Sequence, residues 1–395
     1  MNTVLFDDEV RLNLLPFTFT RPVALIRVGI LTIREKWERM LGRPAGFLTE
    51  RYLSKKFTHD TGESNLFING SLLPDPALVS AVCGLKAGTR LVQGGLVLAA
   101  VADSHDGQSF QTLAAAALQD IRYDGEISRI QYTWDIFSKN EKAITDDFRL
   151  LTHGRTSAPL SPGNHAVNPA SIFLEEGARV EGSFLNASAG PIYIGRNAEV
   201  MEGSMIRGAF ALCEQAVLKM GAKIYPGTTI GPHCRIGGEV NNSVIFGYSN
   251  KAHDGFLGNS VIGEWCNLGA DSNNSNLKNN YSTVKMWSYR EENFVSTGLQ
   301  FCGLMMGDHS KCSINTMFNT GTLVGVSANI FGNGFPPKLV PSFSWGGSEG
   351  FSTYKLQEAM DVAQRVVERR NLLFDAADQE IFKHLFVEAT VHRAW

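Results

Sequence analysis

The stretch IGRNAEVMEGSMIRGAFALCEQAVLKMGAKIYPGTTIGPHCRI, residues 194–236, carries an aliphatic residue at every sixth position. Neither an α-helix, with apolar positions every 3.6 residues, nor a strand, which alternates every second residue, sustains a period of six. This period is typical of a solenoid whose coils have three flat sides, each one hexad long. The rung positions, expected to point inward and stack between coils, are Ile194, Val200, Ile206, Leu212, Leu218, Ile224, Ile230 and Ile236.

The repeat continues on both sides after changes of phase. Gly, Asn and Asp recur between the rungs, as corners with unusual backbone dihedrals require. The pattern predicts a parallel β-helix of hexapeptide repeats over residues 171–347, interrupted by a polar and aromatic loop at 273–301. The further rungs are Leu174, Val180, Val244, Phe256, Ile262, Leu268, Met306, Cys312, Phe318, Val324 and Ile330.

The remainder of the chain predicts an α/β region and a helical end. Residues 1–155 have the character of an α/β domain, with a helical pattern at 30–42 that ends on a glycine. A linker rich in Pro, Gly, Ser and Asn follows at 156–170. Residues 348–395 predict a C-terminal α-helical segment. Its apolar face contains Leu356, Met360, Ala363 and Val367.

Composition narrows the class of protein. The 395 residues are 44% hydrophobic with a net charge of −3, so no global charge draws the chain to nucleic acid or an anionic membrane. The six cysteines form no C-x-x-C pair, which excludes that metal-site spacing and favours reduced thiols. The first residues, MNTVLFDDEVRL, lack the basic start and apolar run of a signal peptide. We expect a cytoplasmic protein with neither nucleic-acid nor membrane partners.

Lys251, His253 and Asp254 interrupt the repeat where an aliphatic rung is expected. Charged side chains in a solenoid wall are tolerated at a surface or cleft, because burying a charge is costly. A corner histidine that is hydrogen-bonded to a neighbouring coil is the plainer interpretation of this triplet. The residues around the triplet favour a functional site instead.

The segment SNKAHDGFLGNSVIGEWCNLGADSNNSN, residues 249–276, resembles a motif of the bifunctional bacterial enzymes that make UDP-N-acetylglucosamine. Their motif runs S-K-x-x-H-x-x-Y-x-G-D, then an Ile-Gly hexad, V-N-I-G-A-G and a later Asn. The form typical of Bacteroidetes is the most similar. These enzymes join an N-terminal uridylyltransferase domain to a left-handed β-helix that acetylates glucosamine-1-phosphate. The resemblance therefore implies that hand, and acetyl-CoA as acyl donor.

The resemblance also implies roles for four residues. His253 falls on the catalytic histidine, Phe256 on the tyrosine, and Asn267 and Asn276 on the two asparagines. A neutral imidazole can take the proton released when an amine attacks a thioester, and an asparagine amide can donate to the oxyanion. We expect His253 and Asn267 to be catalytic. Lys251, Phe256 and Asn276 are expected to bind the amino-sugar phosphate or the coenzyme.

Two stretches depart from that family. Its basic R-P-G turn reads Tyr-Pro-Gly at 225–227, and its lysine pair falls in EVNNSV at 239–244. The charges that grip the sugar phosphate are therefore missing at these places. Either the acceptor differs, or Lys251, Lys223 and Arg235 replace them.

The segment LNLLPFTFTRPVALIRVGILTI, residues 12–33, resembles the opening of sugar-phosphate nucleotidyltransferases, and WDIFSKN at 134–140 resembles a segment near that domain's end. The resemblance implies a Rossmann-like mixed sheet. FDDEVRL at 6–12 replaces the family's Gly-rich phosphate loop and puts carboxylates where a triphosphate would bind. Two interpretations stay open. Either the domain binds a nucleotide sugar without turnover, or Mg²⁺ and nucleotide are held by Asp7, Asp8, Arg11, Arg21 and Lys36.

Three functions remain open at this point. The first is acetyl transfer from acetyl-CoA to an amino-sugar 1-phosphate, with or without nucleotidyl transfer in the N-terminal domain. The second is a sugar-1-phosphate nucleotidyltransferase whose β-helix is purely structural. The third is a non-catalytic trimer that binds a nucleotide sugar. Because one solenoid edge offers only a shallow site, we expect a homotrimer with clefts between coils.

Overall fold

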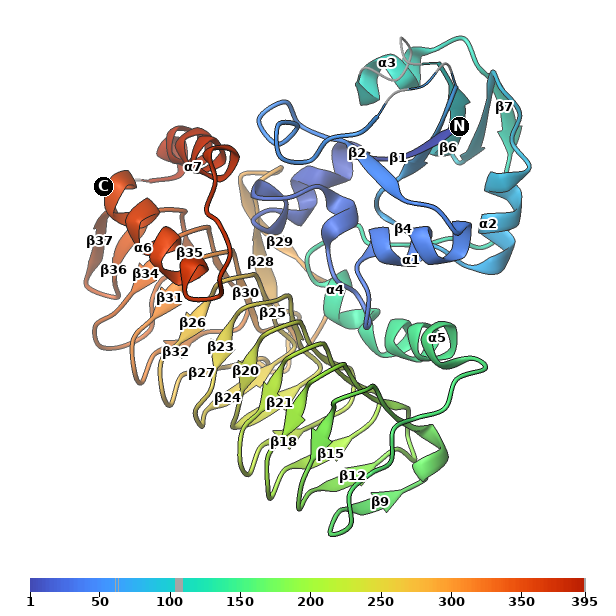
Figure 1. Cartoon of the computed structure of the whole chain (residues 1–395). Helices are drawn as coiled ribbons and strands as arrows, with labels where there is room; N and C mark the ends of the chain where they lie inside the picture. The colour runs from blue at the N-terminus through green and yellow to red at the C-terminus, as the bar shows by residue number, and fades with distance from the viewer. Residues whose placement is uncertain (61, 63, 104–108, 394–395) are drawn as a thin grey trace. The chain divides into compact units, whose positions relative to one another are not determined.

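The computed structural model describes residues 1–60, 62, 64–103 and 109–393. The chain forms two compact units (Figure 1). None of the described helices has the length and apolar character that crossing a bilayer requires. Unit 1 comprises Met1–Ile26 and Leu31–Tyr132, and unit 2 comprises Arg27–Ile30 and Thr133–Trp395.

Unit 1 is built on a six-stranded sheet in the order β2-β1-β3-β6-β5-β7. β1 runs parallel to β2 and β3, whereas β6 runs antiparallel to β3 and β5. The expected mixed sheet is therefore confirmed. Its strands are β1 (Asn2–Phe6), β2 (Ala45–Leu48), β3 (Asn65–Asn69), β5 (Thr89–Gln93), β6 (Leu96–Ala102) and β7 (Gln119–Arg122), and β4 (Leu72–Leu73) pairs with β8 (Ser128–Arg129).

Short helices connect these strands. α1 begins with a capping box, in which Thr32 and Glu35 each accept a hydrogen bond from the other's amide. It ends at Gly42, whose φ of 68° is left-handed, so the helix predicted at 30–42 and its glycine stop are confirmed. The helices of unit 1 are α1 (Ile33–Leu41), α2 (Pro76–Cys83), α3 (Phe110–Ala115) and the 3₁₀ turns η1 (Glu9–Leu14), η2 (Phe17–Phe19) and η3 (Val23–Leu25).

Unit 2 contains a coil with three sheet faces of nine, ten and six strands, here named side 1, side 2 and side 3 (Figure 1). Strands on each side pair in parallel from coil to coil, except for the last pair of side 2. The expected left-handed parallel β-helix of hexapeptide repeats is confirmed.

The strands of the three sides are short. Side 1 contains β10 (Ile172–Leu174), β13 (Ile192–Ile194), β16 (Phe210–Leu212), β19 (Thr228–Ile230), β22 (Val244–Ile245), β25 (Val261–Ile262), β30 (Leu304–Met306), β33 (Thr322–Val324) and β35 (Leu339–Val340). Side 2 contains β11 (Arg179–Val180), β14 (Glu199–Val200), β17 (Val217–Leu218), β20 (Arg235–Ile236), β23 (Asn250–Lys251), β26 (Asn267–Leu268), β31 (Lys311–Cys312), β34 (Asn329–Ile330), β36 (Ser344–Gly347) and β37 (Gly350–Thr353). Side 3 contains β9 (His165–Val167), β12 (Phe184–Asn186), β15 (Met205–Arg207), β18 (Lys223–Ile224), β21 (Glu239–Asn241) and β24 (Phe256–Gly258).

The rungs stack because three hexads complete one coil. Ile194, Leu212 and Ile230 are successive partners on side 1, and all three are fully buried. Every third rung therefore returns to the same side. This is how a six-residue period in the sequence produces three apolar columns along one core.

The coil shortens after Ile236. Ile230 pairs with Ile245, and Ile236 pairs with Lys251, so fewer than three hexads separate these partners. The shortening changes the phase of every later rung. It also places a lysine in an otherwise apolar column.

Two of the predicted rungs are wrong by one position. Ile245 and Leu257 face the core, in place of the predicted Val244 and Phe256. The shortened coil explains both errors, because a strict count of six cannot follow it. The other predicted rungs belong to the core, including those from Met306 to Ile330.

The expected loop at 273–301 is only partly a loop. Asn273–Asn274 forms β27, which pairs with β32 (Met317–Phe318) and still belongs to the coil. The excursion contains an antiparallel hairpin of β28 (Lys285–Ser288) and β29 (Asn293–Ser296). A fully buried Met286 anchors this hairpin.

Helices α4 (Asp135–Ser138) and α5 (Asn140–Thr152) belong to unit 2. Asn140 Nδ2 donates to the Gly227 carbonyl at 2.7 Å, and its Oδ1 accepts from the Gly29 amide at 2.6 Å. The segment Arg27–Ile30 is thus held between α5 and the coil.

One corner of the coil carries a column of stacked rings, here called the ring column. His233, Tyr248, Trp265 and His309 all have left-handed φ angles between 54° and 62°. Successive ring centroids lie 4.7, 4.2 and 6.1 Å apart. Phe382 of α7 packs edge-on against His309 at 5.2 Å, so the C-terminal helices contact this corner.

The C-terminal segment contains two helices, α6 (Leu356–Glu368) and α7 (Ala376–Glu388), followed by the 3₁₀ turn η6 (Ala389–His392). The predicted helical segment is therefore confirmed. Met360, Ala363 and Val367 of α6 are buried, as the predicted apolar face requires.

Candidate functional site

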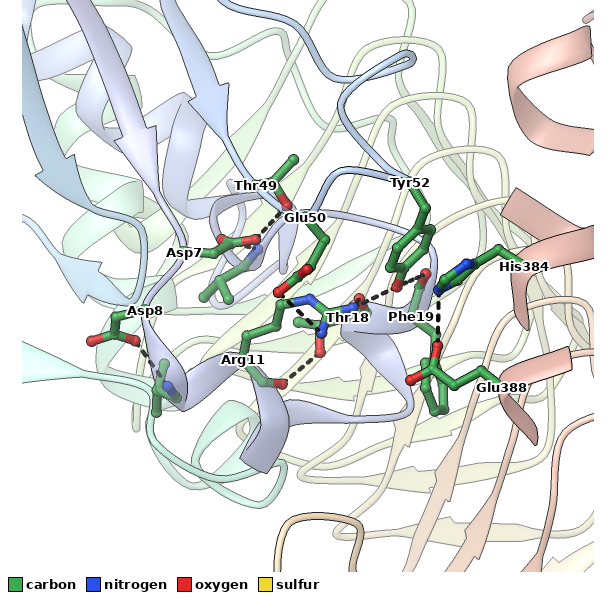
Figure 2. A network of polar contacts seen from close by, with 12 residues as sticks. Asp7, Asp8, Arg11, Thr18, Phe19, Thr49, Glu50, Tyr52, His384 and Glu388 are labelled. Atoms are coloured by element: carbon green, nitrogen blue, oxygen red, sulfur yellow. Dashed lines mark hydrogen bonds and ion pairs between the residues drawn. The ribbon is translucent and has the colours of Figure 1, made fainter. Parts of the chain in front are cut away.

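The carboxyl end of β1 leads to a cavity of about 640 Å³ within unit 1. Three of the five residues predicted to bind metal or nucleotide line it, namely Asp7, Asp8 and Arg11 (Figure 2). Parallel pairing of β1 with β2 brings the loop after β2 to the same place. Lining residues that the sequence did not single out include Thr49, Glu50, Arg51, Ser54, His59 and Gln111.

Asp7 is buried and hydrogen-bonded through both carboxylate oxygens. The Thr49 hydroxyl donates to Oδ2 at 2.6 Å, and the Val23 amide donates to Oδ1 at 2.9 Å. Burial raises the pKa of Asp7 to about 6, although these two hydrogen bonds and the charge of Arg11 oppose the rise. The charge of this cavity therefore changes just below neutral pH.

Asp8 caps the turn that replaces the expected phosphate loop. Its Oδ1 accepts from the Val10 amide at 3.0 Å, at the start of η1. Its Oδ2 accepts from Asn69 Nδ2 at 2.8 Å and pairs with Arg129 Nη2 at 3.3 Å. The charge of Asp8 is thus neutralised within the protein.

Both carboxylate oxygens of Asp7 and of Asp8, the predicted Mg²⁺ ligands, already accept a hydrogen bond from the protein. A Mg²⁺ ion held by one or two carboxylates together with substrate phosphates would share these oxygens with their donors. In the part of the chain that the structure describes, no group of three or more His, Cys, Asp or Glu side chains is placed to hold a metal ion.

Arg11 is held by contacts inside the unit (Figure 2). Its Nη2 donates to the Thr18 carbonyl at 3.1 Å and to Tyr52 Oη at 2.5 Å. Glu50 lies 3.9 Å from its Nη1, at the rim. Arg11 therefore lines the cavity as a fixed, 5% exposed cation.

Arg21 and Lys36 do not line this cavity. Their side chains are only 6% and 5% exposed, respectively. The predicted grouping of these two residues with Arg11 around a nucleotide is therefore not formed in this structure.

His253 occupies an exposed corner of the coil, between β23 on side 2 and β24 on side 3. Its carbonyl accepts a hydrogen bond from Lys251 Nζ at 2.9 Å. In the following coil the Asp271 amide donates to the Asp254 carbonyl at 3.0 Å. The backbone on both sides of the imidazole is thus fixed, while the residue remains open to solvent.

Lys251 does not reach the surface. It is the inward residue of β23, in register with Ile236, and is 2% exposed. Burial lowers the pKa of Lys251 to about 8, against the opposing charges of Asp254 and Asp271. This placement contradicts the predicted contact between Lys251 and a bound phosphate.

The other three predicted residues lie on two sides of the coil. Asn267 is exposed on side 2, in register with Asn250. Phe256 belongs to side 3. A β-carbon added at Gly258 would lie 2.5 Å from the Phe256 ring and 2.7 Å from Asn276 Nδ2, so these two side chains meet there. The His253 corner joins the two sides.

Two asparagines that the sequence assigned to a loop hold side 3. The Phe256 amide donates to Asn273 Oδ1 at 2.8 Å, and the Gly258 amide donates to Asn274 Oδ1 at 2.9 Å. The sequence feature that marks these two residues is the Asn-rich run, which is typical of both loops and solenoid corners.

Comparison with known proteins identifies the N-terminal part. Residues 3–156 match the family described as sugar nucleotidyl transferase. The chain is 25% identical over 148 residues to the uncharacterized acetyltransferase YaiX of Escherichia coli, covering 37% of this chain and 64% of that protein.

Several relatives are named as bifunctional proteins. The chain is 28% identical over 144 residues to a sugar-1-phosphate nucleotidylyltransferase/acetyltransferase of Sulfurisphaera tokodaii, covering 36% of this chain and 35% of that protein. It is 23% identical over 271 residues to the bifunctional protein GlmU of Synechococcus elongatus, covering 62% and 54%. The chain thus spans between 35% and 64% of the length of these three relatives.

The family match and the coil occupy successive parts of the chain. The match covers the mixed sheet of unit 1 and extends through α4 and α5, and the strands of the coil begin at β9. The chain therefore joins a part that is similar to sugar nucleotidyl transferases to a hexapeptide-repeat β-helix.

Proposed function

We propose that the coil transfers an acetyl group from acetyl-CoA to an amino-sugar 1-phosphate, with glucosamine-1-phosphate as the first acceptor to test. The observation that carries the proposal is the exposed His253 at a corner whose backbone is fixed by Lys251 and by the next coil. The bifunctional nucleotidylyltransferase/acetyltransferase relative supports the same class of reaction.

In the proposed reaction the acceptor amine attacks the thioester carbonyl carbon and forms the C–N bond. His253 takes the proton that the nitrogen loses. The side-chain amide of Asn267 donates to the oxyanion of the tetrahedral centre. As the C–S bond breaks, the thiolate takes the proton back from His253, which leaves CoA and the N-acetylated sugar phosphate.

The acceptor phosphate needs a cation other than Lys251. Arg235 is exposed on side 2, in register with Asn250, which is in turn in register with Asn267. Lys223 is exposed on side 3, away from that row. We propose Arg235 as the phosphate-binding residue, because it shares a face with Asn267.

For unit 1 we propose binding of a nucleotide or nucleotide sugar in the cavity lined by Asp7 and Arg11. The carboxylate of Asp8, neutralised by Arg129 within the protein, favours binding over nucleotidyl transfer. A homotrimer, in which a neighbouring coil completes the acetyl-transfer site, is part of the proposal. Light scattering of the purified chain tests that stoichiometry.

The deciding experiment measures thiol release from acetyl-CoA in the presence of glucosamine-1-phosphate. Wild type is expected to turn over, and His253→Ala is expected to lose about 10²- to 10⁴-fold in kcat. His165→Ala is the matched control, because His165 lies on side 3 in β9, several coils away.

Other outcomes would favour the alternatives. Pyrophosphate release from a nucleoside triphosphate and a sugar 1-phosphate, without thiol release, would favour a nucleotidyltransferase with a structural coil. Binding of a nucleotide sugar without either turnover would favour a binding protein.

A further inference from the structure

The inward column of side 2 contains a buried lysine, Lys251. Its inward residues are aliphatic at Leu218, Ile236 and Leu268, but Lys251 stands between the last two. Burying a charge is costly, and an aliphatic side chain fits this column at the neighbouring rungs. Packing alone therefore gives no reason for a lysine at this rung.

The ammonium of Lys251 connects two consecutive corners. Nζ donates to the Gly237 carbonyl at 3.0 Å and to the His253 carbonyl at 2.9 Å. Gly238, whose φ is +74°, makes room for it, since a β-carbon there would lie 2.8 Å from Nζ. The lysine thus ties the corner that carries the imidazole to the corner of the preceding coil.

We propose that Lys251 is a positioning residue, which fixes the backbone of His253 from inside the coil so that the imidazole faces the reacting amine. The inference rests on the acetyl transfer proposed above. It assigns Lys251 an internal role, in place of the phosphate contact expected from the sequence. A misplacement of about 1 Å in a catalytic group can cost about 10²-fold in rate.

The test replaces Lys251 by methionine, which keeps the length and apolar stem but removes both hydrogen bonds. We expect kcat for thiol release to fall by about 10- to 100-fold, while KM changes by less than about threefold. A residue with a merely structural role would show the reverse pattern, a lower Tm and a retained kcat.

Ile236→Met is the matched control. Ile236 is the inward residue that precedes Lys251 in the same column, and this variant introduces the same side chain without removing a hydrogen bond. We expect its kcat to stay within about twofold of wild type. An equal loss of kcat in both variants would overturn the inference.

A second measurement separates this inference from the proposed reaction. In protein labelled with ¹⁵N at histidine, the imidazole signals of His253 are assigned by their loss in His253→Ala. Lys251→Met is expected to shift or broaden those signals and leave the other histidines unchanged. If wild type releases no thiol, the proposed reaction fails. If the His253 signals do not respond to Lys251→Met, the positioning role fails.

Discussion

The hydroxyl of Thr49 donates a 2.6 Å hydrogen bond to the carboxylate of Asp7, at the point where β1 and β2 deliver their loops to one cavity. The bond is too weak to overcome the cost of burying the carboxylate, because the pKa of Asp7 still rises to about 6. Because the pKa of Asp7 differs between the folded and the unfolded chain, the free energy of unfolding depends on pH.

The first prediction concerns Asp7. Its folded-state pKa lies above the unfolded value, so its contribution to stability is present below about pH 4 and is lost as pH rises through about 6. The loss amounts to about 3 kcal/mol. Urea unfolding of wild type and Asp7→Asn between pH 4.5 and 7 should show a downward slope that the variant lacks. Equal slopes would contradict the prediction.

The second prediction concerns Lys251. Its folded-state pKa is lowered to about 8, so between about pH 8 and 10.5 the unfolded chain binds more protons than the folded one. Stability should rise over that range by about 3 kcal/mol relative to Lys251→Met. The measurement is the difference in unfolding free energy between the two proteins at pH 7.5 and pH 10. A constant difference would exclude a lowered pKa.

The third prediction concerns the ring column. Tyr248 and Trp265 stack at 4.2 Å, and such pairs contribute about 0.5–1.5 kcal/mol beyond their buried area. A double-mutant cycle should use asparagine, which tolerates the left-handed φ of both positions, so that backbone strain does not confuse the result. The coupling energy is expected in that range. A value near zero would mean that the stack does not stabilise the corner.

The fourth prediction concerns Asn140. Asn140→Ala leaves the buried Gly29 amide and Gly227 carbonyl without this partner, at about 1–3 kcal/mol for each group. We expect a fall of several kcal/mol in unfolding free energy. Glu141→Ala, at the exposed neighbouring position, is the control and should change stability by less than about 0.5 kcal/mol. Similar effects of both variants would refute the role of Asn140.

The fold could be predicted from the sequence because one physical rule governs most of it. Stacking requires an inward apolar residue on each side of each coil. The sequence from Ile194 to Ile236 follows this rule at every sixth position without a break. The rule fails where the coil shortens. The predicted inward residues Val244 and Phe256 therefore each lie one position before the residue that faces the core. His233 and Tyr248 adopt left-handed φ angles at corners where Gly, Asn or Asp is expected, so the sequence does not predict the stacking of their rings.

The candidate site was harder to predict because sequence order does not say which way a side chain points. Lys251 and His253 stand two residues apart, yet one lies in the core and the other in solvent. Thr49 and His59 reach the cavity because β2 pairs with β1, and no local sequence pattern predicts that pairing. Four of the predicted roles remain predictions, namely those of His253, Asn267, Phe256 and Asn276.

The shortened coil after Ile236 has a consequence for how this architecture can change over generations. The loss of residues at the two corners between Ile236 and Ile245 displaced no strand from its column, since the next coil resumes pairing on all three sides. Corners can therefore gain or lose length while the flat sides cannot. Variation in length should accumulate at corners such as that of His253, where new chemistry can arise without disturbing the stack.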